Sequence, residues 1–499
     1  MKQKALYNSL TTILLQLVSA VIGLIIPRLI IRTFGSEING ITQAITQFLN
    51  YIVLLEAGVG GVVRAALYKP LVENDFKTLG GIIKATESFF RKIAYIFIVY
   101  LCILACGFPF MQHNSYSYFF NASLVIIIGL TTVAQYYFGI TYMVFLQTDQ
   151  RGYIVNVLSI FTVVLNAVFV YTLIKLGFGI HVVKLFSSII FILKPLAMNW
   201  YVKKKYSNIQ FNTKPDFSSI KQRWDGLAQH IAFFVYSNTD VVILTLFTDF
   251  ATVSVYSVYY MIMNGLSNLL SCISAAFTPM IGRMIALNDK NALDKAVRSF
   301  ELACFIFGNI VFTVAAFVII PFVRIYVKNI SDANYINYVF GFLMAMMAFM
   351  LIIRNMYNNI VLAAGHFKST NVSAYIETAV NIVVSLALVN VIGLSGVALG
   401  TFLGLLYKTI YYIFYLKKHI LFRPVNVFFK QFTVTIICVA INVLLYIEFG
   451  YLIVCSGYFQ WAVVSLIITL IVAFVVFSVH GLFYKKEFIY IIKKYLKRA

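Results

Sequence analysis

Ionisable side chains lie inside long apolar stretches of this sequence. Three are acids, namely Glu56, Asp240 and Glu377. A single carboxylate at membrane depth is costly unless it is paired or protonated. Each of the three therefore has two interpretations. It is either a site for a coupling proton or sodium ion, or a structural partner for an arginine or a neighbouring helix.

Basic side chains form a second set within these stretches. Three of them lie about 13 Å inside their helices at 1.5 Å per residue, and the others lie nearer the helix ends. Arginine binds phosphate through its bidentate fork, so the set predicts a cationic inner wall for a phosphate-bearing ligand. The alternative is that the long stems reach out to the lipid headgroups. The candidate cations are Arg28, Arg64, Lys194, Arg283, Arg354 and Lys408.

Polar residues follow a helical period on two apolar stretches. At about 100° per residue, one side of the stretch 37–66 carries Asn39, Thr46, Gly61 and Arg64, and a later stretch repeats the pattern. Such a face suits a water-filled interior, or else tight packing between helices. The candidates for a polar cavity face are Gln43, Gln47, Asn50, Asn264, Asn268 and, one turn after Arg354, Asn358.

Signs of catalysis are missing from the sequence. It has no metal-spaced cluster of His or Cys, no phosphate-binding loop and no nucleophile motif. Its six cysteines are scattered along the chain, and we interpret them as small apolar packing residues. We expect no catalytic residue, no metal site, and no cofactor other than a coupling proton or sodium ion. An enzyme is therefore not predicted.

The elements that must position these residues are membrane-spanning helices. Of the 499 residues, 61% are hydrophobic and only 11% are charged, against about 25% in soluble domains. Many apolar runs exceed the roughly 18 residues of a spanning helix. The predicted class is an all-α polytopic membrane protein with about 14 transmembrane helices. They are expected near 8–31, 37–66, 91–111, 119–147, 153–175, 180–202, 226–248, 252–281, 300–322, 334–363, 370–391, 396–416, 428–449 and 460–483.

The net charge of +22 is spread unevenly over the predicted loops. Most Lys and Arg fall on one side of the membrane, which by the positive-inside rule is the cytoplasmic side. Both termini are then cytoplasmic, and the basic tail 485–498 lies on anionic membrane lipids. This pattern argues against nucleic acid as a partner. Apolar stripes at 79–90 and 293–300 predict helices in the plane of the interface.

An internal repeat gives the domain organisation. Asn50 matches Asn264, Asn166 matches Asn381, and further pairs keep an offset of about 214 to 216. Six spans per repeat give the halves the same orientation, related by an axis along the membrane normal. The predicted parts are a lobe at 1–202, a basic linker at 203–225, a second lobe at 226–418, and two further helices with the tail at 419–499.

The segments IPRLIIRTFGSEINGI, LLEAGVGGVVRAALYKPL and SNTDVVIL resemble polysaccharide transporters of the multidrug/oligosaccharidyl-lipid/polysaccharide (MOP) superfamily. These include O-antigen and capsule repeat-unit flippases of the bacterial cell membrane. The resemblance implies a MATE-like or lipid II flippase-like body and an undecaprenyl-diphosphate-linked oligosaccharide substrate. The substrate would move from the cytoplasmic to the outer leaflet by alternating access.

The resemblance also suggests residue roles and partners. It implies that Arg28 and Arg64 are cavity arginines and that the last two helices form a groove for the lipid tail. A polysaccharide polymerase and glycosyltransferases are the implied protein partners. Ala251, opposite Gly35 in the repeat, departs from the family's glycine.

Two other functions remain open. A cation-coupled multidrug exporter is favoured by Asp240, but Lys194, Arg354 and Lys408 count against it. The second function is that of a non-transporting scaffold in a cell-wall assembly complex. The two polar helix faces argue against this function.

Overall fold

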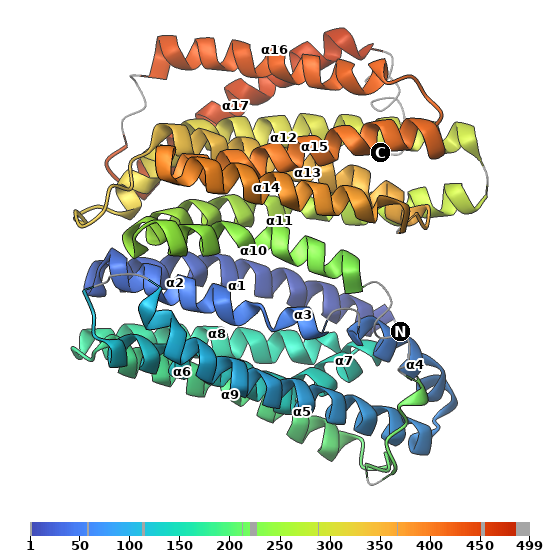
Figure 1. Ribbon diagram of the computed structural model, residues 1–499. Helices are drawn as coiled ribbons and strands as arrows, with labels where there is room; N and C mark the ends of the chain where they lie inside the picture. The colour runs from blue at the N-terminus through green and yellow to red at the C-terminus, as the bar shows by residue number, and fades with distance from the viewer. Residues whose placement is uncertain are drawn as a thin grey trace. The chain divides into compact units, whose positions relative to one another are not determined.

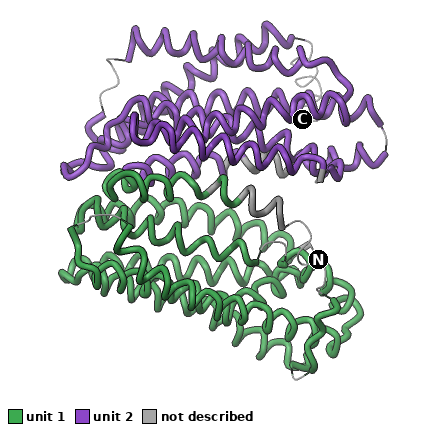
Figure 2. The backbone as a smooth tube through the Cα atoms, viewed as in Figure 1, with its two compact units in different colours: residues 1–254 green, residues 255–499 purple. Residues whose placement is uncertain are grey.

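The computed structural model describes residues 2–56, 59–111, 115–211, 213–219, 227–287, 289–366, 368–450 and 455–485. These residues form helices and contain no strand (Figure 1). The all-α fold expected from the composition is confirmed. The chain divides into two compact units, residues 1–254 and 255–499 (Figure 2).

Unit 1 contains the first ten α-helices. The chain turns between α1 and α2 at Gly35, whose φ of 90° favours glycine. The Asp75 side chain caps the N-terminus of α5. The elements are α1 Lys2–Phe34, α2 Ser36–Asn50, α3 Val53–Glu56, α4 Val59–Glu73, α5 Phe76–Gly107, η1 Phe108–Phe110, α6 Tyr118–Ala134, η2 Gln135–Gly139, α7 Ile140–Thr148, α8 Gly152–Lys175, α9 Ile180–Lys205 and α10 Leu227–Phe247.

Unit 2 begins within α11 and contains the remaining helices. Its core is built around α12, α13 and α15, where Phe300, Tyr357 and Tyr412 are buried together. A second cluster joins α12 to α16 and α17. The elements are α11 Phe250–Ala286, α12 Lys290–Tyr326, α13 Tyr338–Ala363, η4 Lys368–Thr370, α14 Asn371–Ile392, α15 Leu394–His419, α16 Asn426–Phe449 and α17 Tyr458–Phe483.

The chain is a multi-pass membrane protein. Within the described residues, eleven helices are long and apolar enough to cross a membrane, or up to twelve if the bent pair 36–56 and 59–73 is one span. The long helices α10 and α11 come in addition to these. The arrangement is consistent with about 14 spans, and the number itself stays a prediction.

The compact units do not coincide with the lobes expected from the repeat. The division falls at 254/255, whereas the second lobe was expected to begin at 226. Helix α10 packs on α2 and α3 within unit 1. The repeat-based boundaries stay a prediction. Residues 220–226 of the expected linker and 486–499 of the basic tail lie outside the described residues.

A continuous helix over 37–66 is wrong. Helix α2 ends at Asn50, α3 is a single turn, and α4 begins at Val59. The Tyr100 hydroxyl of α5 donates to the Phe48 carbonyl at 2.8 Å and satisfies a backbone group near the break. The polar stripe therefore does not run on one helix face from Asn39 to Arg64. Ala57, which helical spacing also places on this predicted face, lies outside the described residues.

The prediction of two separate helices in the plane of the interface is also wrong. The stripes at 79–90 and 293–300 lie in the first turns of the long helices α5 and α12. Leu79, Ile82 and Phe90 are buried in unit 1, and Val297 and Phe300 in unit 2. Their apolar faces are covered by protein, and each stripe belongs to a helix that continues well beyond it.

Candidate functional site

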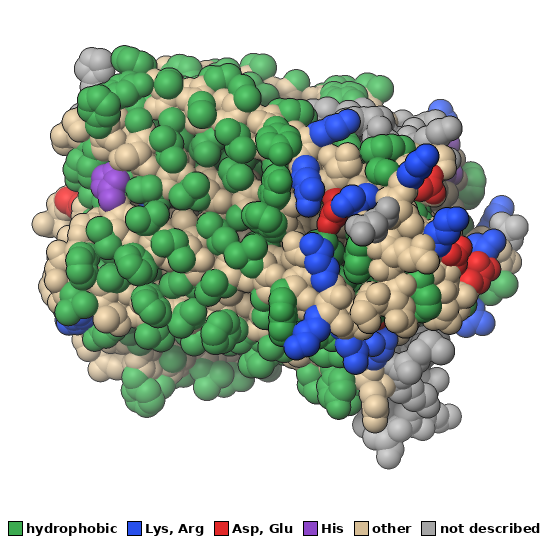
Figure 3. Space-filling model, turned by 90° about the horizontal axis from the view of Figure 1, so that it is seen from below, with side chains coloured by type: hydrophobic (Ala, Val, Ile, Leu, Met, Phe, Trp, Pro, Cys, Tyr) green, Lys and Arg blue, Asp and Glu red, His purple; other side chains and the backbone are tan. Residues whose placement is uncertain are grey.

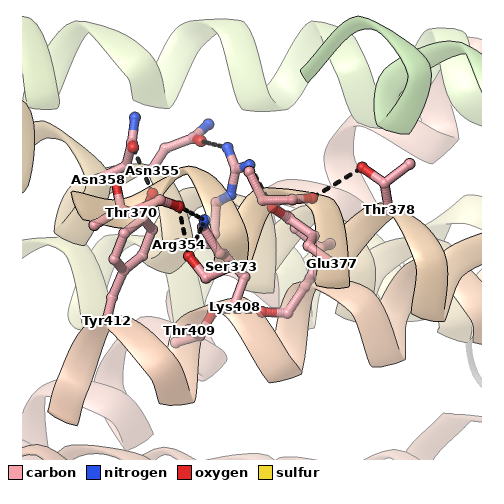
Figure 4. Close-up of polar contacts among 12 residues, drawn as sticks. Arg354, Asn355, Asn358, Thr370, Ser373, Glu377, Thr378, Lys408, Thr409 and Tyr412 are labelled. Atoms are coloured by element: carbon pink, nitrogen blue, oxygen red, sulfur yellow. Dashed lines mark hydrogen bonds and ion pairs between the residues drawn. The ribbon is translucent and has the colours of Figure 1, made fainter. Parts of the chain in front are cut away.

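A buried polar cluster lies where α13, α14 and α15 meet in unit 2 (Figure 4). We call it the α13–α15 cluster. Its members are Arg354, Asn355 and Asn358 on α13, Thr370, Ser373 and Glu377 at the start of α14, and Lys408 and Tyr412 on α15.

A glycine ladder on α15 brings the cluster together. Gly396, Gly400 and Gly404 recur every fourth residue and precede Lys408 at the same spacing. A Cβ at Gly400 would lie 2.2 Å from the Ser385 hydroxyl and 2.8 Å from the carbonyl oxygen of Asn381. Small residues at this spacing let two membrane helices approach closely. The ladder therefore seats α15 on α14 and carries Lys408 to the first turn of α14.

Arg354 and Glu377 form a buried ion pair. The Arg354 Nη2 and Glu377 Oε2 atoms are 2.9 Å apart, and the two side chains are 6% and 1% exposed. The guanidinium also donates from Nη1 to Asn355 Oδ1 at 3.0 Å. A buried charge of this kind is stable only when it is paired and hydrogen-bonded. Glu377 is thus a structural partner of an arginine in this conformation.

Lys408 is held by hydroxyl and carbonyl oxygens. Its Nζ donates to Ser373 Oγ at 2.6 Å and to the Thr370 carbonyl at 3.3 Å. The ammonium lies 4.8 Å from the centre of the Tyr412 ring, and the Tyr412 hydroxyl donates to Asn358 Oδ1 at 2.6 Å. With 1% exposure, Lys408 does not reach out to lipid headgroups.

The cluster carries more positive than negative charge. Lys408 is attracted by the Glu377 carboxylate and repelled by the Arg354 guanidinium. Among the described residues, the ion pairs of the cluster contain no other acid. Two cations thus share one anion inside three packed helices. An anionic group would be stabilised here, whereas a third cation would be repelled.

The structure brings together four of the residues predicted for the site: Arg354, Asn358, Glu377 and Lys408. Sequence reasoning missed Asn355, Thr370, Ser373 and Tyr412. A signal existed for two of them, since Ser373 stands four residues before Glu377 and Tyr412 four after Lys408, on the same helix faces. Thr370 acts through its backbone carbonyl, which leaves no sequence signal.

Part of the predicted polar face packs inside unit 1. Asn39 Nδ2 donates to the Ser254 hydroxyl at 2.7 Å, and the Gln47 amide donates to Asn238 on α10. A Cβ at Gly40 would lie 1.7 Å from the carbonyl oxygen of Phe250. These residues join α2 to α10 and to the first turn of α11. For Asn39 and Gln47, helix packing is the interpretation that the geometry supports.

The other acids lie in unit 1. Asp240 is 6% exposed on α10, two residues from the Gln47 contact. Glu56 is half-buried at the end of α3, and the Tyr136 hydroxyl hydrogen-bonds its carboxylate. Tyr136 belongs to η2, a π-helical turn. Such turns are frequent at functional sites. Glu56 and Asp240 remain candidates for ion coupling.

The remaining predicted residues do not join the α13–α15 cluster. Arg28, Gln43 and Lys194 are half-buried in unit 1. Arg64 is exposed and donates to the Gly60 carbonyl at 3.2 Å. Exposed as well are Asn50, Asn264, Asn268 and Arg283. Their assignment to a substrate cavity stays a prediction.

Comparison with known proteins shows a membrane-transporter fold. No protein-family model and no curated protein matches the sequence. Among solved structures, the lipid II flippase MurJ in an inward closed conformation matches with a TM-score of 0.68 at 15% identity, over 96% of this chain and 99% of that chain.

Multidrug transporters match as well. An inward-facing MATE transporter of the MOP superfamily has a TM-score of 0.62 at 15% identity, over 81% of this chain and 96% of that chain. A eukaryotic MATE transporter has a TM-score of 0.56 at 11% identity, over 83% and 95%. The expected MATE-like and lipid II flippase-like fold is confirmed.

Proposed function

We propose that the protein is a flippase for undecaprenyl-diphosphate-linked oligosaccharide repeat units. It would move them from the cytoplasmic to the outer leaflet of a bacterial cell membrane by alternating access, for the synthesis of a surface polysaccharide. Both termini would be cytoplasmic.

The extent of the structural likeness carries this proposal. The alignments with the two MATE transporters include almost all of those chains but only 81% and 83% of this chain, so 19% and 17% of this chain have no counterpart in them. The lipid II flippase is covered to 99% and matches 96% of this chain. The protein thus has a MATE-sized body with an addition that the lipid II flippase shares. A carrier of lipid-linked sugars accounts for that addition better than a carrier of small drugs.

Helices α16 and α17 suit the lipid part of the substrate. They pack on α12 through one face, and their other faces expose Ile436, Leu444, Leu466 and Phe474. A polyprenyl tail needs only apolar surface. The tail can remain along such helices while the sugar crosses through protein, and the costly step of drawing a glycan through hydrocarbon is avoided.

The charge of the α13–α15 cluster suits the diphosphate. Two cations share one carboxylate there, and a diphosphate brings about two negative charges, which arginine binds bidentately. In the described conformation the cluster is buried, so the proposal requires it to open during the cycle. Outward movement of the charges is favoured by roughly 2.3 kcal/mol per charge per 100 mV. A proton or sodium ion at Asp240 or Glu56 would then reset the carrier.

A flipping assay tests the proposal. The purified protein is placed in sealed vesicles with a fluorescent polyprenyl-diphosphate-linked disaccharide, and a membrane-impermeant quencher reports the leaflet of the label. We expect the protected fraction to fall with the protein present. A fluorescent phosphatidylcholine is the control, and it should remain protected. Equal protection of the disaccharide with and without protein would contradict the proposal.

A cation-coupled drug exporter is the second candidate function. The MATE likeness and the buried carboxylate of Asp240 favour it. Expression in cells that lack their own exporters separates the two functions. Lower ethidium accumulation that depends on an ion gradient would favour the exporter, and unchanged accumulation the flippase.

A further inference from the structure

We propose that unit 1 carries a binding site for an anionic phospholipid where α5, η2 and α9 meet the headgroup level. The site is a collar of cations and aromatic rings. Its members are Arg91 and Tyr95 on α5, Tyr137 on η2, and Trp200, Lys203 and Lys204 on α9. The inference does not depend on the proposed function.

A view from the side of α5 and α9 shows the charge pattern (Figure 3). Lys and Arg side chains gather at one end of a broad apolar surface and form a band along its border. The border between apolar surface and charge is where lipid headgroups lie. Basic pockets at this level on membrane proteins bind anionic headgroups.

The collar is continuous across three helices. Lys203 Nζ lies 6.0 Å from the centre of the Tyr142 ring on α7, and the Tyr142 hydroxyl donates to Glu87 on α5. Glu87 Oε2 in turn lies 3.9 Å from Arg91 Nη2. This chain of contacts links Lys203 on α9 to Arg91 on α5 through α7, which packs on both helices.

The positive charge of the collar is only partly balanced. Glu87 is 8% exposed and serves both Lys84 and Arg91. Among the described residues, Lys203 and Lys204 make no ion pair and are exposed. A phosphate group would supply the missing anion, because charge-assisted contacts to phosphate are strong.

Aromatic rings lie under these cations. The Arg91 guanidinium carbon lies 5.0 Å from the centre of the Tyr137 ring, and Lys204 Nζ lies 4.8 Å from the Trp200 ring. Trp200 is 63% and Tyr95 56% exposed. Amphipathic rings of this kind prefer the level of the headgroups.

All three helices reach the same depth at the collar. The starts of α6 and α9 lie together, since the Phe120 and His181 rings are 4.5 Å apart. The Tyr118 hydroxyl at the start of α6 donates to the backbone carbonyl of Cys106 near the end of α5. At 1.5 Å per residue, Arg91, Tyr137 and Trp200 lie about 24, 29 and 30 Å from these ends. Tyr137 and Trp200 thus lie at the far edge of a hydrocarbon layer of about 30 Å, and Arg91 lies about one helical turn short of it. The collar therefore lies at the headgroup layer on the other side of the membrane from the starts of α6 and α9.

Apolar rows continue from the collar into the membrane. On α9, Leu196, Leu193 and Ile189 are exposed behind Trp200, and on α5, Val99 and Ile103 are exposed behind Tyr95. A soluble phosphate would use the cations alone. A phospholipid would use the cations with its headgroup and these rows with its chains. The geometry thus favours a lipid over a free anion.

Quenching of Trp200 fluorescence tests the site. Trp224→Phe and Trp461→Phe in the full-length protein leave Trp200 as the single tryptophan. The protein is placed in phosphatidylcholine vesicles with a small fraction of chain-brominated phosphatidylglycerol or, at equal fraction, brominated phosphatidylcholine. We expect stronger quenching by the anionic lipid, at an apparent affinity about tenfold higher or more.

Matched variants identify the cause of the preference. Lys203→Gln/Lys204→Gln should reduce it by about tenfold, and Lys203→Arg/Lys204→Arg should keep it. The control is Lys417→Gln/Lys418→Gln, the repeat-related exposed pair on α15, which should leave it unchanged. High salt should weaken the preference in the parent protein, independently of how any variant folds.

Several results would overturn the inference. Equal quenching by the two brominated lipids is one such result. A preference for the anionic lipid that survives Lys203→Gln/Lys204→Gln is another. Relief of quenching by inorganic phosphate is the third, and it would identify a soluble-anion site. Because the readout is lipid contact, failure of this inference leaves the flipping assay unaffected, and the reverse also holds.

Discussion

Asn39 and Ser254 are joined by a hydrogen bond of 2.7 Å although they stand 215 residues apart. This separation falls within the offset of about 214 to 216 that the predicted repeat keeps, so the repeat would make the two residues counterparts. The hydrogen bond joins the start of α2 to the start of α11 within unit 1.

Gly40 tests this contact. A Cβ there would lie 1.7 Å from the Phe250 carbonyl oxygen, and a backbone oxygen cannot move aside as a side chain can. Gly40→Ala is expected to destabilise the protein by about 1–3 kcal/mol or more, as overpacking does. The measurement is thermal unfolding in detergent, followed by size-exclusion chromatography.

The matched control for this contact is Gly23→Ala on α1. A Cβ at Gly23 meets nothing within 4 Å, and replacement of a helical glycine by alanine is slightly stabilising. Equal melting temperatures for the two variants would show that α2 and α11 do not approach closely in the membrane.

Variants of the Arg354–Glu377 ion pair can show whether the pair stabilises the fold, takes part in flipping, or does both. Arg354→Ala should destabilise unit 2 by about 3–5 kcal/mol, because it leaves a buried carboxylate uncompensated. The apolar double variant Arg354→Met/Glu377→Leu should restore most of that stability. Unfolding of both variants in detergent, compared with the parent, measures the effect.

Flipping activity in these two variants gives the functional answer. If the cluster binds the diphosphate, the double variant folds but flips the labelled disaccharide at least tenfold more slowly. Full activity in a stable double variant would assign the pair to structure alone. The phosphate-binding cations would then have to be sought among the other candidates, Arg28, Arg64, Lys194, Arg283 and Lys408.

The sequence was sufficient for the fold and only partly for the cluster. Apolar runs and the repeat predicted the helices, and helical spacing placed Asn358 beside Arg354. The break after α2 was not predicted, and the Tyr100 hydroxyl that donates to the Phe48 carbonyl beside it stands 52 residues further along the chain. The long-range partners of Lys408 were missed for the same reason. The glycines of α15 did signal a close helix contact, but a spacing of four names no partner helix.

The linker after α9 should respond to acid. Hydrogen bonds from the Ser218 and Ser219 hydroxyls hold the pKa of Asp216 below its usual value, and the Asp216 N–H donates to the Gly81 carbonyl at 3.0 Å. A pKa that is lower in the folded state stabilises the fold at any pH above the unfolded-state pKa of about 3.9. This stabilisation is lost as the pH falls toward the lower pKa of the folded state.

We therefore expect amide exchange at 213–219 to be slow near neutral pH and to quicken below about pH 4, after correction for intrinsic rates. Asp216→Asn should remove this change, since the amide does not titrate. Hydrogen exchange read by mass spectrometry on both proteins is the measurement. An identical acid response in the variant would assign it to other groups.

Arg423 should anchor the last two helices. It lies in the loop before α16 and is 5% exposed. It pairs with the buried Glu301 on α12 and, at 3.6 Å, with the partly exposed Asp294, and it stacks over the Phe428 ring at 4.2 Å. Arg423→Ala leaves Glu301 buried and uncompensated, at about 3–5 kcal/mol. We expect proteolysis to cut near 420–425 at much lower protease concentration than in the parent.

The control for Arg423 is Arg298→Ala. Arg298 also pairs with an acid of α12, Asp294 at 2.7 Å, but its side chain is 42% exposed. A pair so open to solvent contributes about 0.2–1 kcal/mol, so this variant should be cut like the parent. If both variants became equally sensitive, general loss of charge at this end of α12 would be the cause. Sensitivity of Arg423→Ala alone assigns the anchoring of α16 and α17 to the buried pair.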